Sequence, residues 1–301
     1  MHSMGSTSVS FGDLHGAAHA YPAAGAAVLP VPLERTVSWG RGTCHGPAAI
    51  IEASRFLELW DEELGTDPSS VGIATLPAVA LPDSLSDALA TLRWETRHRL
   101  EDGKLLILLG GEHSLTAGAV RGALDAYGRP LGVVQFDAHA DLRDEYEGTP
   151  LSHACVMRRV VDDELPTLSI GVRSLSQPEA ELIRERELPV VWGHQLTTLH
   201  DARWRELLAA LPDRIYLTFD LDYFDPSVLP ATGTPEPGGG TWHPTMALLR
   251  TLFATKEVVA VDVVELSPIA GHPASDFVAA KLAYKCIAYW QAGRAATSPV
   301  D

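Results

Sequence analysis

Histidine and carboxylate residues follow four short apolar segments of this 301-residue sequence. The segments are Leu105–Leu109, Gly132–Phe136, Arg214–Phe219 and Val258–Val264. The polar residues that follow them are His113, Asp137, His139, Asp141, Asp220, Asp222 and Glu265. In α/β proteins the carboxyl ends of the strands form the binding crevice, so these segment ends would gather the seven side chains in one small volume.

A cluster with this many carboxylates predicts bound divalent cations. Acids crowded in a partly dry site raise each other's pKa values, and a cation removes that penalty. Two histidines and four aspartates are too many ligands for one tetrahedral zinc, and they suit two ions about 3.5–4 Å apart. Imidazole and carboxylate ligands without a thiolate favour manganese, with magnesium, cobalt and iron as alternatives. Taken alone, Asp220 and Asp222 have a simpler interpretation as loop-capping acids, so the metal prediction depends on the motifs together.

The order of the secondary-structure elements predicts how these residues are positioned. The predicted strands are Ala27–Val31, Val71–Thr75, Leu105–Leu109, Gly132–Phe136, Leu168–Val172, Pro189–Trp192, Arg214–Phe219 and Val258–Val264. The predicted helices cover about 46–64, 84–102, 115–127, 152–163, 178–187, 201–211, 244–255 and 274–292. Continuous apolar strands that alternate with helices indicate a parallel sheet covered on both faces. A TIM barrel has the same element order, and we favour an open three-layer α/β/α sandwich.

Composition and charge narrow the range of functions. The chain has 23 Lys and Arg against 39 Asp and Glu, a formal net charge of −16. An acidic surface repels phosphate, so we expect no nucleic-acid partner, whereas a cationic ligand suits it. No stretch approaches 18 apolar residues, so no membrane span is expected. Three widely separated cysteines indicate no disulfide framework and favour a cytoplasmic setting. We expect a loosely ordered arm over residues 1–26, followed by a single domain over residues 27–301.

The motifs resemble those of the ureohydrolase family, which contains arginases, agmatinases and related guanidino hydrolases. The matching segments are Gly110–Ser114, Asp137–Asp141, Thr218–Pro226, Gly233–Gly239 and Val261–Pro268. The resemblance implies a three-layer α/β/α sandwich on an eight-stranded, largely parallel sheet. It also implies two Mn²⁺ ions per subunit and a homo-oligomer, commonly a trimer or hexamer. Glu112 stands where many members have Asp, and we expect little effect because His113 is retained.

Within this family the chain looks most like an agmatinase, which converts agmatine to putrescine and urea. The segments Asp141–Gly148, Ser152–Arg159 and Ser275–Leu282 are similar to agmatinases. Arginases carry a Gly-x-Arg-Asp-x-Asp segment, and Gly171–Ser176 lacks both acids. The alternatives are N1-aminopropylagmatine, which would give spermidine, and guanidinobutyrate. A zinc polyamine deacetylase is disfavoured because no adjacent histidine pair occurs, and a non-catalytic polyamine-binding protein is disfavoured because every ligand is retained.

The resemblance also suggests a role for each site residue. Asp137 and Asp220 would bridge the two ions, His113 and Asp141 would bind one, and His139 and Asp222 would bind the other. Asp141 would also hydrogen-bond the attacking hydroxide, and Glu265 would accept two parallel N–H bonds from the guanidinium. His153 has a suitable intrinsic pKa to carry a proton to the leaving amine.

The far end of agmatine is a second cation, and four acids are candidates to bind it. They are Asp144, Glu145, Glu147 and Glu236. Arg143 has the opposite implication, because it could hold the carboxylate of guanidinobutyrate, and a role as a structural ion-pair partner is the alternative for this residue. The aromatic residues Trp39, Tyr146 and Trp242 are candidates to line the aliphatic spacer, and core packing is the alternative for each.

Overall fold

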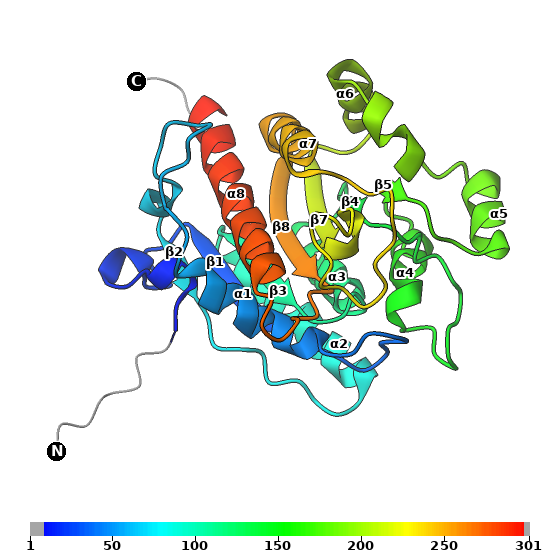
Figure 1. Ribbon diagram of the computed structural model, residues 1–301, viewed down its shortest axis with the longest axis horizontal. Coiled ribbons are helices and arrows are strands. Elements are labelled where there is room, and N and C mark those ends of the chain that lie inside the picture. The colour runs from blue at the N-terminus through cyan, green and yellow to red at the C-terminus, as the bar shows by residue number, and fades with distance from the viewer. Residues whose placement is uncertain (1–8, 298–301) are drawn as a thin grey trace.

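The computed structural model describes residues 9–297 and contains one eight-stranded sheet (Figure 1). Its strands are β1 (Ala26–Val31), β2 (Ile73–Thr75), β3 (Leu105–Gly110), β4 (Gly132–Phe136), β5 (Thr167–Val172), β6 (Val190–Trp192), β7 (Arg214–Asp220) and β8 (Glu257–Val264). They lie in the order β2-β1-β3-β8-β7-β4-β5-β6, and every neighbouring pair is parallel. The open parallel sheet confirms the preferred prediction and excludes the barrel.

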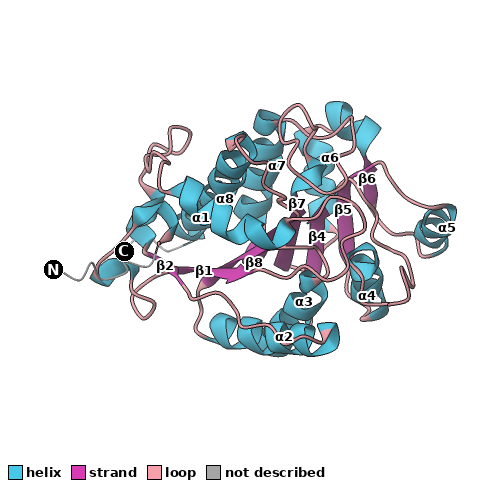
Figure 2. Ribbon diagram, turned by 60° about the horizontal axis from the view of Figure 1, so that its bottom comes forward, coloured by secondary structure: helices cyan, strands magenta, loops and turns pink. Residues whose placement is uncertain are grey.

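Helices cover both faces of the sheet, which Figure 2 shows nearly edge-on. The helices are α1 (Gly46–Ser54), α2 (Leu85–Glu101), α3 (Leu115–Tyr127), α4 (Val156–Asp162), α5 (Gln177–Glu185), α6 (Asp201–Ala209), α7 (Trp242–Thr255) and α8 (Ala274–Thr297). Buried residues of α1, α6, α7 and α8 belong to one apolar core, and those of α2, α3, α4 and α5 to the other. Within residues 9–297, no helix has the length and apolar character needed to cross a bilayer.

Strand β3 shows why these segments read as continuous apolar runs. All six of its residues are buried. Leu105, Ile107 and Leu109 face one core, whereas Leu106 and Leu108 face the other. Because successive side chains of a strand point to opposite faces, a strand covered on both sides needs an apolar residue at every position.

The helix expected over residues 46–64 is shorter than predicted and ends at Ser54. Beyond it the chain turns around the buried Asp61, whose carboxylate accepts hydrogen bonds from the backbone N–H groups of Glu63 and Leu64. The Nζ of Lys285 on α8 lies 2.9 Å from Asp61 Oδ2. A buried carboxylate requires such partners. Contacts with α8, rather than helical hydrogen bonds, therefore determine the conformation of this segment.

Residues 1–26 were expected to form a loosely ordered arm, but the described part of this segment makes contacts with the domain. Phe11 is fully buried, and its backbone N–H donates to Thr75 Oγ1 at 2.8 Å. The backbone N–H of Gly12 donates to Ser54 Oγ at 2.8 Å. The segment from Phe11 therefore packs on the domain and leads directly into β1, and residues 1–8 lie outside the described residues.

Candidate metal centre and active site

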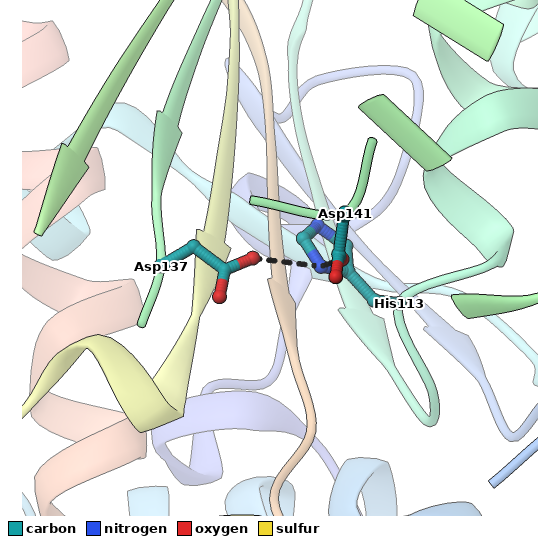
Figure 3. A group of neighbouring side chains, drawn as sticks. All are labelled: His113, Asp137 and Asp141. Atoms are coloured by element: carbon teal, nitrogen blue, oxygen red, sulfur yellow. Dashed lines mark ion pairs between the residues drawn. The ribbon is translucent and has the colours of Figure 1, made fainter. Parts of the chain in front are cut away.

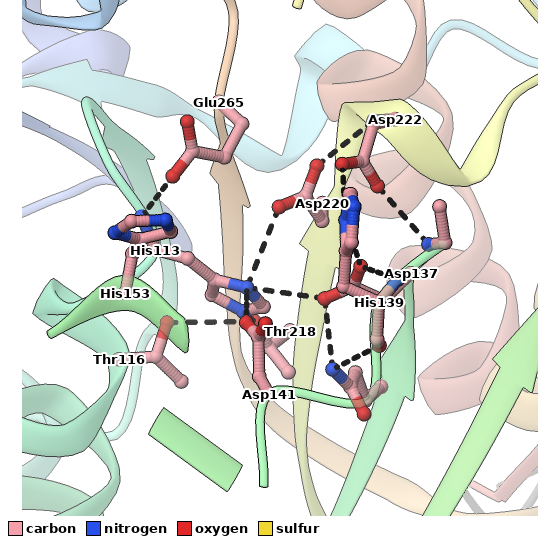
Figure 4. A network of polar contacts seen from close by, with 12 residues as sticks. His113, Thr116, Asp137, His139, Asp141, His153, Thr218, Asp220, Asp222 and Glu265 are labelled. Atoms are coloured by element: carbon pink, nitrogen blue, oxygen red, sulfur yellow. Dashed lines mark hydrogen bonds and ion pairs between the residues drawn. The ribbon is translucent and has the colours of Figure 1, made fainter. Parts of the chain in front are cut away.

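The four strands that end in polar residues are neighbours at the centre of the sheet. Their order is β3, β8, β7 and β4. Phe136 of β4 pairs with Phe219 of β7, so the next residues, Asp137 and Asp220, lie side by side at the carboxyl ends of these strands. Glu265 follows β8 directly, and its backbone N–H donates to the carbonyl of Gly111 beyond β3. The topology therefore brings all seven predicted side chains to one edge of the sheet (Figure 4).

One group of possible metal ligands consists of His113, Asp137 and Asp141 (Figure 3). His113 Nδ1 lies 3.2 Å from Asp137 Oδ2 and 3.0 Å from Asp141 Oδ2. Asp220 Oδ2 is also near, 3.4 Å from the same nitrogen. All four side chains are buried, so their polar atoms face one another in a site with little water.

The second group consists of Asp137, His139 and Asp222. His139 Nδ1 lies 2.8 Å from Asp222 Oδ2 and 3.7 Å from Asp137 Oδ1. Asp137 thus belongs to both groups and directs a different oxygen toward each. This arrangement suits two neighbouring cations that share one carboxylate.

The chemistry of these side chains fits divalent cations. His113 Nδ1 is buried and makes no hydrogen bond, although three carboxylate oxygens lie within 3.4 Å of it. Burial and the charge of Asp137 raise the pKa of Asp141 to about 7, and burial with the charges of Asp222 and Asp137 raises the pKa of Asp220 well above its usual range. Without cations the crowding favours the protonated forms of these acids, whereas divalent ions would hold them ionised and bind the Nδ1 lone pair of His113.

A buried polar network behind His113 sets its tautomer. His113 Nε2 lies 2.8 Å from Thr218 Oγ1, which donates to Asp262 Oδ1 at 2.6 Å. Thr116 and Tyr216 each donate a hydroxyl hydrogen bond to Asp262 Oδ2 at 2.7 Å. Because the Thr218 proton goes to the carboxylate, His113 donates from Nε2, so a neutral ring directs an unprotonated Nδ1 toward the aspartates. Burial opposes a charged ring, but Asp137, Asp141 and Asp220 raise the pKa of His113, so it is a bound cation that would keep Nδ1 unprotonated.

This supporting network was not predicted from the sequence, although two signals of it are present there. Asp262 is an acid inside the otherwise apolar strand β8, and such a residue needs partners when it is buried. Thr218 precedes Asp220 by two residues in β7, so both side chains point to the same face.

A cavity of about 170 Å³ opens over the two ligand groups. Its deep part is lined by His113, His139, Asp141, Asp220, Asp222 and Glu265. His153 lines its side, and burial lowers the pKa of this imidazole. Burial raises the pKa of Glu265 to about 8. The eight residues predicted for metal binding and catalysis therefore lie together, with Asp137 beneath the rest.

Toward solvent, the cavity is lined by uncharged residues and one cation. Trp39, Arg143, Tyr146 and Thr234 lie there, and Trp39 is 81% exposed. The Arg143 guanidinium lies 5.0 Å from the centre of the Tyr146 ring. Trp242 stacks on Phe224 away from the cavity, so the core-packing alternative holds for this residue.

The structure places none of the four acids predicted for the far amine in the cavity lining. Asp144 pairs with Arg159 at 2.7 Å, and its side chain is 72% exposed. Glu145 and Glu147 are exposed on the same loop. Glu236 lies beyond Thr234, and its carbonyl accepts a hydrogen bond from Arg173. These acids are close to site residues in the sequence. The direction of each side chain, however, depends on the conformation of its loop.

Comparison with known proteins agrees with this geometry. The model of the arginase family matches residues 24–288. A Synechocystis protein named N(1)-aminopropylagmatine ureohydrolase is 44% identical over 278 residues, 90% of each chain. The agmatinase of Pyrococcus horikoshii is 35% identical and covers 86% of this chain and 90% of its own. The crystal structure of agmatine ureohydrolase from Thermoplasma volcanium superposes with a TM-score of 0.83 at 31% identity, over 92% of this chain and 94% of that one.

The chain belongs to the arginase family. It is a hydrolase that acts on amidino carbon–nitrogen bonds, and the family depends on a pair of metal ions. The ureohydrolase resemblance of the motifs and the predicted fold are thereby confirmed.

Proposed function

We propose that the protein removes urea from a guanidino polyamine, and that N1-aminopropylagmatine is its best substrate, with spermidine as the other product. The 44% identity with a protein named for that reaction, against 35% with an agmatinase, supports this choice. The sequence motifs alone favour agmatine as the substrate, with N1-aminopropylagmatine as an alternative. The comparisons favour the reverse order, and agmatine remains consistent with them.

One observation carries the proposal of metal-assisted hydrolysis. Two groups of candidate ligands, all buried except the partly exposed His139, share Asp137 beneath a cavity that Glu265 and His153 line. Two divalent cations held there by these residues would lower the pKa of a solvent molecule toward neutrality. The ligand set of imidazole and carboxylate without thiolate supports manganese as the metal.

The residues of the cavity then bind the guanidinium and manage its protons. Glu265 is held from below by the backbone N–H of His113 at 2.6 Å and presents its carboxylate to the cavity. A carboxylate accepts two parallel N–H bonds from a planar guanidinium and thereby orients it. His153 gives a proton to the leaving amine, and its pKa, lowered by burial, suits release of that proton.

The open end of the cavity accommodates a substrate with a long tail. The exposed ring of Trp39 and the ring of Tyr146 offer aromatic faces to methylene groups and to a distal ammonium. Arg143, whose Nε lies 3.9 Å from Glu179 Oε2, repels an ammonium and attracts a carboxylate, so guanidinobutyrate is a further candidate substrate after agmatine. The net charge of −16 favours the approach of a polycation over long distance.

Assembly and location extend the same proposal. We propose a homo-oligomer, a trimer or hexamer, that acts in the cytoplasm without a nucleic-acid or membrane partner. The resemblance to ureohydrolases supports the oligomer, and the separated cysteines support a reducing compartment.

A urea-release panel with the Mn²⁺-loaded protein tests the proposal. We expect kcat/KM to fall in the order N1-aminopropylagmatine, agmatine, guanidinobutyrate and arginine. A higher value for guanidinobutyrate than for either polyamine would move the assignment to guanidinobutyrate. Turnover of arginine comparable with agmatine would contradict the substrate class, and no urea from any of the four would contradict the proposed function.

A further inference from the structure

Glu112 ties a loop at the cavity to the end of strand β3. It is fully buried, and its Oε2 accepts hydrogen bonds from the backbone N–H groups of Arg35 and Thr36, each at 2.6 Å. Its Oε1 accepts from Thr36 Oγ1 at 2.9 Å and from Ser114 Oγ at 2.6 Å. We expected little effect from Glu at this position, yet this carboxylate holds four donors, two of them backbone groups of the cavity loop.

Thr36 connects Glu112 to His153. Thr36 Oγ1 lies 3.0 Å from the backbone nitrogen of His153 and 3.2 Å from its Nδ1. A hydroxyl has one proton and two lone pairs, a carboxylate only accepts, and a backbone N–H only donates. The Thr36 proton therefore goes to Glu112, and both lone pairs accept from His153. With a proton on Nδ1 the ring donates to Thr36, and Nε2 remains free for the substrate. Ser152 Oγ lies 3.3 Å from the same Nδ1 and is a second polar neighbour of it.

We infer that Thr36 and Glu112 are positioning residues that fix the ring and the tautomer of His153. The arrangement is a carboxylate, a hydroxyl and an imidazole in series, which orients a general acid–base group as a carboxylate does directly in other enzymes. Tyr146 packs edge-on against the other side of the His153 ring, with centroids 5.8 Å apart. Figure 4 draws His153 on the same side of the metal-ligand cluster as Glu265.

This inference rests on the proposed function, because it assigns a proton transfer within it. Water adds its oxygen to the guanidinium carbon, and the bond from that carbon to the substituted nitrogen breaks. The unprotonated Nε2 of His153 accepts one proton from the water and passes it to the leaving nitrogen, which keeps the electron pair of the broken bond. The second proton of the water completes the ammonium group of the product. A misplaced ring slows the proton transfer but leaves guanidinium binding to Glu265 unchanged.

The test compares Thr36→Val, which has the same shape without the hydroxyl, with Thr36→Ser, which keeps the hydroxyl. Acid–base catalysis contributes about 10²–10⁴-fold, so we expect Thr36→Val to lower kcat about tenfold or more. We expect KM within about twofold of wild type, two Mn²⁺ per subunit, and Thr36→Ser within about threefold of wild-type kcat. Thr91→Val is the matched control, since it removes a hydroxyl that bonds only within α2, to the carbonyl of Asp87.

A double-mutant cycle separates positioning from general stability. If Thr36 acts through His153, then adding Thr36→Val to His153→Ala lowers the residual rate by less than about twofold. An equal loss in both backgrounds, an unchanged kcat in Thr36→Val, or loss of bound metal from that variant would each overturn the inference. Failure of the proposed function is distinct, because the wild-type protein would then release no urea.

Glu112→Gln provides a second measurement on the same chain of contacts. The amide places N–H groups opposite donors, so we expect a loss of kcat similar to that of Thr36→Val and little further loss when the two are combined. Wild-type kcat in a folded Glu112→Gln protein would overturn the role of Glu112. If that variant does not fold, Thr36→Val and the cycle decide the question.

Discussion

Thr218→Val should weaken the binding of one metal ion of the pair and leave the binding of the other nearly unchanged. The substitution keeps the shape of the side chain and removes the acceptor 2.8 Å from His113 Nε2. Asp262 keeps the hydroxyls of Thr116 and Tyr216, so the loss falls mainly on the histidine. Removing the acceptor of a buried N–H group costs about 1–3 kcal/mol.

This free energy acts mainly on the metal-bound state. In the metal-free variant, the proton of His113 can move to Nδ1, where Asp141 Oδ2 lies 3.0 Å away and accepts it. A bound cation prevents that exchange, because it needs the Nδ1 lone pair. We therefore expect the dissociation constant of one ion to rise about 10–100-fold, or about 1.4–2.8 kcal/mol, as other second-layer substitutions do. The dissociation constant of the ion bound by Asp137, His139 and Asp222 should change by about threefold or less.

Calorimetric titration of the metal-free protein with Mn²⁺ measures both sites. The wild-type protein should bind two ions, and Thr218→Val should bind one with unchanged affinity and one more weakly. Thr218→Ser should restore the second ion. Thr116→Val is the control, since it removes another donor to Asp262 but leaves the contact of His113 intact. Unchanged affinity for both ions, or equal weakening of both, would refute the argument from the tautomer.

Three further predictions follow from the same structure. Asp137→Asn should lose both ions and all activity, because this carboxylate belongs to both ligand groups; metal analysis that finds one tightly held ion would contradict the shared role. The metal-free protein should become less stable as pH rises from about 5 to 8. The folded pKa values of Asp141, about 7, and Glu265, about 8, exceed those of the unfolded chain, so the folded state binds more protons in that window. Thermal unfolding in a chelator should show this fall, excess Mn²⁺ should reverse it, and a melting temperature that rises with pH in the chelator would contradict it. Lys285→Met should lower the free energy of unfolding by about 3–5 kcal/mol, because it leaves the buried Asp61 without its cation; denaturant unfolding measures this, and a loss below about 1 kcal/mol would show that the ion pair is dispensable.

The sequence predicted the strands well because burial on both faces leaves a direct signal. Each predicted strand overlaps an observed one, and Gly132–Phe136 agrees at both ends. The pattern of apolar residues does not predict the order of the strands in the sheet. We expected His113 and Asp137 in one site because parallel strands direct their carboxyl ends to the same edge of a sheet. The strand order β3-β8-β7-β4 at the centre of the sheet brings the two residues together.

Loop residues were harder to predict than residues at strand ends. The contact between Thr36 and His153 joins positions 117 residues apart, and no local pattern relates them. Asp144 precedes Tyr146 by only two residues, yet the acid turns to Arg159 at the surface while the aromatic ring lines the cavity. Tertiary contacts decide such directions, so proximity to a motif is weak evidence for a place in the site.

The backbone at two site residues shows that the site is assembled against local preference. Asp141 has φ 52° and Glu265 has φ 66°, in the left-handed region where side chains other than glycine are disfavoured. Such conformations cost of order 1–3 kcal/mol each and persist only where the surroundings impose them. Glycine would relieve the strain but would supply no carboxylate. Burial opposes the ionised form of the same two acids, so both backbone strain and electrostatics weigh against the metal-free site. Cations that hold these carboxylates ionised offset the electrostatic part, and for this reason metal binding and folding should be coupled in this protein.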